Sequence, residues 1–172
     1  NRLRITGGEP LVRNNLAGLI ERLSTIAGID DIALTTNGVL LAEQAAGLKN
    51  AGLQRLNISL DTLNDDVFFQ LSRRRGIDQV IAGIHQAKKL GFDKIRLNAI
   101  AIKSITEQAI VPLATFARQY NLELRFIEFM PLDADDQWQR QQVLTGDEIK
   151  NILETAFCEL LPVTRDDASQ PA

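Results

Sequence analysis

Residues 2–10 read Arg2-Leu3-Arg4-Ile5-Thr6-Gly7-Gly8-Glu9-Pro10, and the rest of the chain repeats their pattern. The first half of this run alternates polar and apolar side chains, which is typical of a β-strand. The second half has two glycines, which allow a tight turn, and a proline where a helix would begin. The same succession continues to about residue 158. The order βαβαβαβαβα predicts an α/β fold with a parallel sheet and right-handed crossovers.

The predicted strands are five short runs: Leu3–Thr6, Ile32–Thr36, Arg55–Leu60, Lys94–Ile102 and Leu122–Phe129. Apolar residues at helical spacing separate these runs, so a helix is expected after each strand. The first helix is expected to open at Pro10, with Val12 on its buried face. Thr145 and Glu148 form a capping-box pattern ahead of the last helix.

The composition excludes several classes of protein. Lys plus Arg number 19 and Asp plus Glu 22, so the formal charge is −3, and such a balanced chain is not a general binder of nucleic acid. No run approaches the roughly 20 apolar residues of a membrane-spanning helix, so we expect no membrane partner. Cys158 is the only cysteine and His85 the only histidine. The chain alone therefore cannot form a disulfide, a Cys-rich zinc site or an all-cysteine iron–sulfur site, and we predict no metal ligands in it.

The start of the chain suggests an internal fragment. It opens at Asn1, without a methionine, directly in a strand-like alternation. We therefore expect a longer natural protein. No linker or low-complexity segment interrupts residues 1–158, which are predicted to form the central part of one domain, and residues 159–172 are predicted to be a polar tail leading out of it.

One side of every predicted strand is polar, although strands covered on both faces are usually near-continuous in Val, Ile and Leu. Successive side chains of a strand point to opposite faces, so the polar ones gather on one face. These polar positions are Arg2, Arg4, Thr6, Thr35, Asn37, Asn57, Ser59, Asp61, Arg96, Asn98, Glu123 and Arg125. Because burying them without partners would be costly, we interpret the sheet as a barrel, or part of one, with a wet or ligand-filled interior.

Four arginines against two acids leave this face net positive, which suits an anion such as a phosphate, since arginine grips phosphate with two parallel hydrogen bonds. For any single arginine, a solvated position paired with an acid is the simpler interpretation. The recurrence of the same alternation in five strands favours a ligand site instead.

Three motifs stand at the carboxyl ends of predicted strands, where barrel enzymes keep their sites. Gly7-Gly8-Glu9 lets the backbone approach a ligand closely, and a carboxylate fixed there could bind an ammonium group. Thr35 opens a Thr-Thr-Asn-Gly turn signal, and Ser59 lies at the end of its strand. Gly-Gly alone does not separate a ligand site from an ordinary turn with an acid at a helix start. For Thr35 and Ser59, each taken alone, turn chemistry is favoured over function.

Four blocks of sequence carry a family likeness: residues 4–11, 35–38, 57–63 and 124–130. Together they resemble the radical S-adenosylmethionine (SAM) superfamily and, within it, the GTP 3′,8-cyclase family of molybdenum cofactor biosynthesis. Gly-Gly-Glu-Pro marks only the superfamily, whereas Arg125–Met130 and the spacing of the blocks are more specific. The likeness runs from about residue 2 to 157. It implies an incomplete six-stranded (βα) barrel, of which this chain holds about five strands.

The resemblance implies two sets of binding residues. Gly7, Gly8, Glu9, Ser59 and Met130 would contact the cofactor SAM, with Met130 at its adenosine. The residues facing the substrate GTP would be Arg4, Thr35, Arg96 and Arg125, with the arginines at the triphosphate and Arg2 as one further phosphate contact. The family usually has lysine where Arg96 stands. It offers no role for the basic loop at Arg73–Arg75.

The family also has parts that this chain lacks. A [4Fe–4S] cluster held by a Cys-x₃-Cys-x₂-Cys loop cleaves SAM, and a second cluster is held by C-terminal cysteines. Neither cysteine set is present, so this chain has no catalytic residue of its own and is expected to be inactive alone. For the full-length protein the resemblance implies a cytoplasmic lyase that needs an electron donor, with a homodimer as one option.

Two other functions stay open at this point. One is a radical SAM enzyme that acts on a peptide or another small substrate, which the four arginines argue against. The other is a cluster-free module that binds a phosphate ligand, which the lack of cysteines supports and the start inside a strand opposes.

Overall fold

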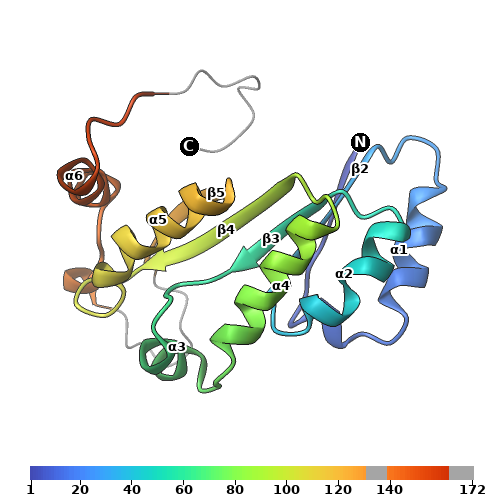
Figure 1. The fold of residues 1–172 in the computed structure, drawn as a ribbon, viewed down its shortest axis with the longest axis horizontal. Coiled ribbons are helices and arrows are strands. Elements are labelled where there is room, and N and C mark those ends of the chain that lie inside the picture. The colour runs from blue at the N-terminus through green and yellow to red at the C-terminus, as the bar shows by residue number, and fades with distance from the viewer. Residues whose placement is uncertain (131–138, 163–172) are drawn as a thin grey trace.

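The five strands form one parallel sheet in the order β1-β2-β3-β4-β5 in the computed structural model, which describes residues 1–130 and 139–162 (Figure 1). The strands are β1 (Arg2–Ile5), β2 (Asp31–Thr36), β3 (Arg55–Ser59), β4 (Lys94–Ala101) and β5 (Glu123–Glu128). The helices are α1 (Leu16–Ser24), α2 (Leu41–Asn50), α3 (Asp65–Ser72), α4 (Ile77–Lys89), α5 (Ile110–Tyr120) and α6 (Gly146–Ala156), with short 3₁₀ helices η1 (Pro10–Val12), η2 (Glu107–Ala109) and η3 (Arg140–Gln142). All five predicted strands and the α/β class are confirmed.

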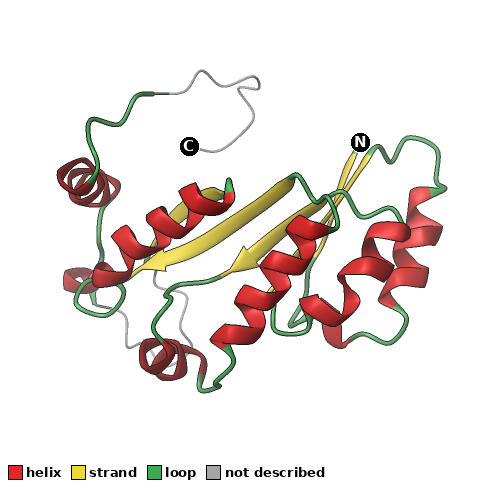
Figure 2. Cartoon of the chain, in the orientation of Figure 1, coloured by secondary structure: helices red, strands yellow, loops and turns green. Residues whose placement is uncertain are grey.

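The hydrophobic core lies between the sheet and the helices on one of its faces (Figure 2). Its strand residues are the apolar half of the predicted alternation, including Leu34, Leu56 and Leu97, each fully buried. Leu48 of α2 and Ile84 of α4 meet them from the helix side. Burying each such side chain contributes roughly 1.5–3 kcal/mol, so this face holds the sheet in place and leaves the other face free for polar groups.

The first helix begins later than predicted. Pro10 opens only the single turn of η1, whose cap Arg13 has extended backbone angles, and α1 starts at Leu16. Asn15 caps α1 by accepting a hydrogen bond from the Gly18 N–H at 3.2 Å. Val12 is 68% exposed, so its prediction as a buried helix residue was wrong. The side-chain cap at Asn15 competes successfully with the proline as a start signal.

Helix α3 was not predicted. Asn64 caps it by accepting from the Asp66 and Val67 N–H groups, and Asp65 and Asp66 lie in its first turn. No residue of α3 is buried, so it lacks the apolar face on which the periodicity argument depends. The cap followed by two acids was the available signal.

The capping box of α6 is confirmed, with Thr145 and Glu148 bonded reciprocally. The Thr145 N–H and the Lys103 ammonium group lower the pKa of Glu148 to about 2. Lys103 follows β4, so this ion pair attaches α6 to the carboxyl end of that strand. Residues 163–172 of the predicted tail lie outside the described residues.

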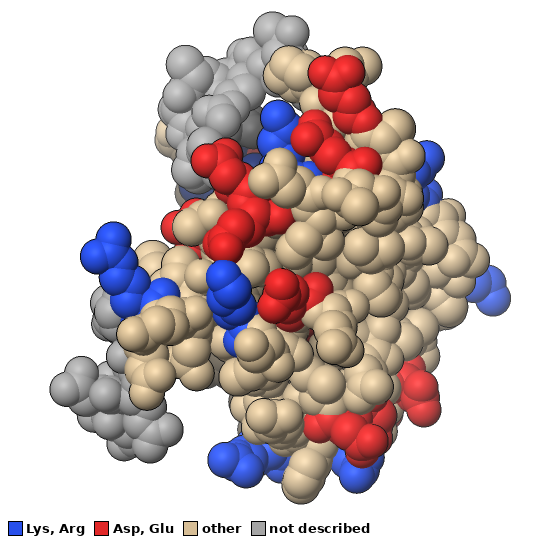
Figure 3. Space-filling model, turned by 90° about the vertical axis from the view of Figure 1, so that its left-hand side faces the viewer, with Lys and Arg blue, Asp and Glu red and all other residues tan. Residues whose placement is uncertain are grey.

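On the side of the molecule shown in Figure 3, which is the left-hand side of Figure 1, many acidic side chains gather in the upper half of the view. Lys and Arg are scattered among and around them. No basic patch of the kind that binds a polyanion without selectivity is visible on this side.

Gly83 allows α4 to pack closely on α2, because a Cβ there would lie 2.9 Å from the Leu41 Cβ and 3.0 Å from the Gly38 carbonyl oxygen. We expect Gly83→Ala to cost about 1–3 kcal/mol through overpacking. The Tm should fall by about 2–4 °C per kcal/mol in thermal unfolding.

Gly47→Ala is the matched control, because its Cβ would meet only the Ala17 Cβ at 4.0 Å. That change should keep or raise the Tm, since alanine favours a helix by up to about 1 kcal/mol over glycine. An unchanged Tm for Gly83→Ala would show that the two helices are not in close contact.

Candidate functional site

The strand register arranges the polar face in transverse rows. The middle row consists of the Cα partners Thr35, Asn57, Arg96 and Glu123, one from each of β2 to β5. The next row toward the carboxyl ends consists of Ser59, Asn98 and Arg125. The row on the other side consists of Arg4, Ala33, Arg55 and Lys94. The prediction that Arg4, Thr35, Ser59, Arg96 and Arg125 share one face is therefore confirmed.

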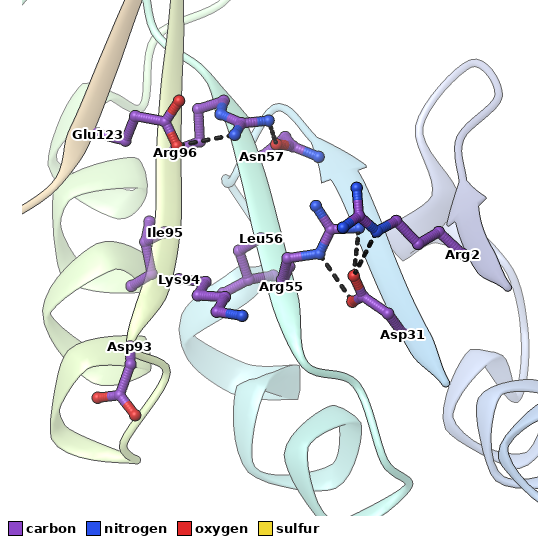
Figure 4. Close-up of a pocket in the computed structure, with 10 residues that line it drawn as sticks. All are labelled: Arg2, Asp31, Arg55, Leu56, Asn57, Asp93, Lys94, Ile95, Arg96 and Glu123. Carbon is purple, nitrogen blue, oxygen red and sulfur yellow. Dashed lines mark hydrogen bonds and ion pairs between the residues drawn. The ribbon is translucent and has the colours of Figure 1, made fainter. Parts of the chain in front are cut away.

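Hydrogen bonds run along the middle row (Figure 4). Arg96 donates from Nη2 to Glu123 Oε2 at 2.8 Å and, more weakly, from Nη1 to Asn57 Oδ1 at 3.5 Å. Asn57 in turn donates to Thr35 Oγ1 at 3.4 Å. Arg125 belongs to the next row toward the carboxyl ends, and it donates from Nε to Glu123 Oε1 at 2.9 Å. Asn57 and Glu123 thus connect three of the four residues that the resemblance assigns to the substrate.

A second charged cluster lies toward the amino ends of the strands, where Arg2 and Arg55 both point at Asp31 (Figure 4). Arg55 makes two bonds of 2.7 Å to the Asp31 carboxylate, whereas Arg2 Nε is 3.9 Å from it. Sequence analysis did not place Arg55 or Lys94 on the polar face. The signal was available, because they stand two residues before Asn57 and Arg96 and a strand repeats its direction every two residues.

A cavity of about 350 Å³ opens over these two clusters. Its lining residues are Arg2, Asp31, Arg55, Leu56, Asn57, Asp93, Lys94, Ile95, Arg96 and Glu123, as drawn in Figure 4. Four basic and three acidic side chains are present, so the lining is nearly neutral as a whole. Arg2 and Arg55 are paired with Asp31, and Arg96 is paired with Glu123.

Two arginines of this face have donors without partners. Arg4 is exposed, and its side chain has no hydrogen bond or ion pair with any residue among 1–130 and 139–162. The Nε of Arg96 is buried and has no hydrogen-bond partner among the same residues. Since buried polar groups are nearly always paired, a donor in this state indicates a place that a ligand acceptor or water completes.

The glycine turn leaves bare backbone at the carboxyl edge of the sheet. Gly7 and Gly8 are exposed, and a Cβ on either would meet nothing within 4 Å. Ser59 is exposed at the same edge, at the end of β3. Its hydroxyl has no partner within the described part of the chain. This edge therefore offers free peptide groups and a hydroxyl to a small molecule.

Glu9 joins two turns that lie far apart in the sequence. Its Oε1 accepts from the Leu11 N–H at 3.0 Å and from the Thr36 hydroxyl at 2.7 Å, and its Oε2 accepts from the Asn37 N–H at 2.7 Å. The Thr36 hydroxyl also accepts from the Gly38 N–H at 3.0 Å. Both carboxylate oxygens are thus engaged in holding the turn after β1 against the turn after β2. A direct bond from Glu9 to an ammonium group stays a prediction.

At the carboxyl ends of β4 and β5, the polar rows are followed by exposed apolar side chains. Ile100 and Ile127 are Cα partners in the last row and are 39% and 37% exposed. Met130, two residues beyond β5, is 51% exposed. Polar and apolar zones therefore follow one another along the strands, which suits a ligand or ligand pair with a charged end and an aromatic end.

Two acids of this face, Asp61 and Glu123, have pKa values displaced in opposite directions. Burial raises the pKa of Asp61, and the hydrogen bond from the Ile100 N–H at 2.7 Å offsets this only in part. Burial acts to raise the pKa of Glu123 as well, but hydrogen bonds from Arg96 and Arg125 outweigh it and hold that pKa below its ordinary value. Glu123 is therefore fully charged at neutral pH.

In residues 1–130 and 139–162, no group of three His, Cys, Asp or Glu side chains is placed to hold a metal ion. Cys158 is exposed. None of the helices described is long and apolar enough to cross a membrane.

The sequence model of the radical SAM superfamily matches residues 1–117. The chain belongs to this superfamily. A coproporphyrinogen III oxidase from Escherichia coli, described as a radical SAM enzyme, has the same fold over 90% of this chain and 38% of its own, with a TM-score of 0.66 and 17% sequence identity. A structure of TYW1 gives the same TM-score and identity, over 90% of this chain and 50% of that one. The sheet is accordingly part of a radical SAM barrel, as predicted.

Curated relatives match almost the whole chain. A protein named GTP 3′,8-cyclase from Rhodopirellula baltica is 48% identical over 170 residues, which cover 99% of this chain and 47% of that protein. Proteins of the same name from Thermodesulfovibrio yellowstonii and Alkaliphilus metalliredigens are 42% and 41% identical, over 94% and 100% of this chain and 50% and 52% of their own. The chain thus spans about half the length of the curated relatives it matches.

Glu9→Gln should destabilise the radical SAM fold, because an amide nitrogen would face one of the three donors. We expect a loss of about 1.5–3 kcal/mol, the value of a hydrogen bond to a charged group, in denaturant unfolding. Thr36→Val should cost less, and the double variant should not cost the sum of the two, since both changes act on the same connected group of hydrogen bonds. Glu21→Gln, an exposed position on α1, is the control and should stay within 0.5 kcal/mol of wild type, as surface changes usually do. Additive effects would show that the two side chains do not interact.

Proposed function

We propose that this chain is the central part of a GTP 3′,8-cyclase, in which it binds and orients SAM and GTP. The observation that carries the proposal is the convergence of Arg4, Arg96 and Arg125 on the face whose carboxyl edge holds the bare Gly7-Gly8 turn. The relatives of that name support it, since their matches cover 99% and 100% of this chain.

The carboxyl edge fits SAM. Open space above Gly7 and Gly8 lets backbone groups reach the methionyl end, with Glu9 holding the turn and Ser59 offering its hydroxyl. Ile100, Ile127 and Met130 would provide the apolar contact for the adenine ring. SAM supplies a carbon-centred radical when bound beside a reduced iron–sulfur cluster. The described residues hold no ligand set for such a cluster, so the role of this chain in the reaction is to place the reactants.

The remaining rows fit GTP, with its triphosphate toward the amino ends of the strands. Arg4 is free to turn toward a phosphate, and Arg96 and Arg125 keep unpartnered N–H groups beside Glu123. Charge-assisted bonds from arginine to phosphate are about twice as strong as neutral ones. Thr35 would orient the ribose or base end. Arg55 lies in the same row as Arg4, and Arg2 lies one row farther toward the amino ends. Both would add to the positive charge of this face.

The proposal has further requirements. The full-length protein needs an electron donor to reduce its cluster, and we place the enzyme in the cytoplasm. A homodimer is one option for its assembly.

Arg125→Ala in the full-length protein should weaken GTP binding by about 10- to 100-fold, the equivalent of about 1.5–3 kcal/mol for a charged hydrogen bond. SAM binding should stay unchanged, since Arg125 is assigned to the triphosphate. Anaerobic equilibrium dialysis with GTP and with SAM measures both affinities.

Arg22→Ala, which removes the same charge from the exposed part of α1, serves as the control and should bind GTP like the wild type. Equal GTP affinity for Arg125→Ala and wild type would contradict the assignment of this face to GTP.

A further inference from the structure

Two arginines from neighbouring rows converge on one carboxylate. Glu123 accepts from Arg96 with one oxygen and from Arg125 with the other, at 2.8 and 2.9 Å. Arg96 and Arg125 come from different strands, β4 and β5, so the carboxylate fixes their guanidinium groups relative to each other. An acid in the middle of a face that gathers positive charge therefore needs a physical explanation.

The position of Glu123 suits a fixed anchor. It is the first residue of β5 and the Cα partner of Arg96, so its backbone is set by the sheet ladder. Its side chain is 50% exposed, whereas those of Arg96 and Arg125 are 18% and 29% exposed. The arginines are partly buried and Glu123 is half exposed, so these two bonds are screened less by solvent than a pair between two fully exposed side chains.

The pairing leaves most arginine donors available. Arg125 uses only Nε on Glu123, so both of its terminal nitrogens have no partner within residues 1–130 and 139–162. Arg96 uses Nη2 on Glu123 and Nη1 on Asn57 at a long 3.5 Å, and its Nε is unpartnered. Glu123 therefore restrains each arginine through one nitrogen and spares the others for an acceptor that arrives later.

We propose that Glu123 is a positioning residue that pre-arranges Arg96 and Arg125 for a polyphosphate. This inference rests on the proposed function, which assigns the two arginines to the triphosphate. Holding long side chains in their bound geometry before the ligand arrives spares about 0.5–1.5 kcal/mol for each side chain that would otherwise be ordered on binding. Asn57 assists by closing the other side of Arg96.

Two roles of Glu123, as a repelling charge or as a positioning residue, predict opposite changes in ligand affinity when it is removed. Glu123 is negative and lies beside the place assigned to an anion, so as a charge alone it repels the ligand and its removal should tighten binding. As a positioning residue it holds the arginines in place, and its removal should weaken binding. The sign of the change therefore separates the two roles.

Two variants of the full-length, cluster-loaded protein make the test. Glu123→Gln removes the charge and presents an NH₂ group to one arginine, and Glu123→Asp keeps the charge but is one methylene too short to reach both. We expect each to raise the Kd for GTP and for inorganic triphosphate by about 5- to 30-fold, the equivalent of about 1–2 kcal/mol at 1.4 kcal/mol per tenfold change. The Kd for SAM should stay at the wild-type value, whereas a general loss of structure would weaken SAM binding as well. The Tm should fall in Glu123→Gln, because Arg96 and Arg125 lose the charge that pairs them. Glu21→Gln is the charge-matched control.

Tighter binding by Glu123→Gln together with wild-type affinity in Glu123→Asp would overturn the inference and leave Glu123 as a simple repulsive charge. Unchanged affinity in both variants would overturn it as well. If the wild type binds inorganic triphosphate but not GTP, the proposed function fails, and the comparison of the variants on triphosphate still decides the role of Glu123.

Discussion

A β-strand sends successive side chains to opposite faces, and in a parallel sheet the ladder hydrogen bonds bring equivalent positions of neighbouring strands side by side. In this molecule both constraints act on strands whose sequence alternates apolar and polar residues. Leu34, Leu56 and Leu97 become one buried layer under the helices, and Thr35, Asn57 and Arg96 become one row on the opposite face. A slip of one residue in any strand would bury arginines and expose leucines, so the core and the site depend on the same register.

The row of polar groups is stable because its charges are paired within the sheet. An arginine taken partly out of water costs several kcal/mol unless it is paired and hydrogen-bonded. Glu123 and Asp31 meet this need at two levels of the face, each bridging two arginines. The same acids offset the repulsion between neighbouring arginines. They also leave terminal guanidinium nitrogens available to a ligand. In this way the interactions that stabilise the empty face also prepare it for an anion.

Much of this arrangement could be predicted from the sequence, because alternation and turn chemistry are local properties. The five strands, their shared polar face and the capping box at Thr145 follow from patterns of two to four residues. The start of α1 and the existence of α3 did not follow. Asn15 caps α1 in a left-handed conformation that no pattern signals, and α3 has no buried residue to mark it. The contacts of Glu9 with Thr36 and Asn37, 27 and 28 residues away, exist only after the strands are placed side by side.

The most direct test of this account is a crystal structure of the full-length protein with GTP and SAM bound. The account predicts phosphate oxygens about 2.7–2.9 Å from guanidinium nitrogens of Arg96 and Arg125, the usual range for charge-assisted bonds. It also predicts adenine packed on Ile100, Ile127 and Met130, with the methionyl end at the Gly7-Gly8 backbone. A triphosphate bound away from these rows, with Arg96 and Arg125 still paired only to Glu123, would contradict it.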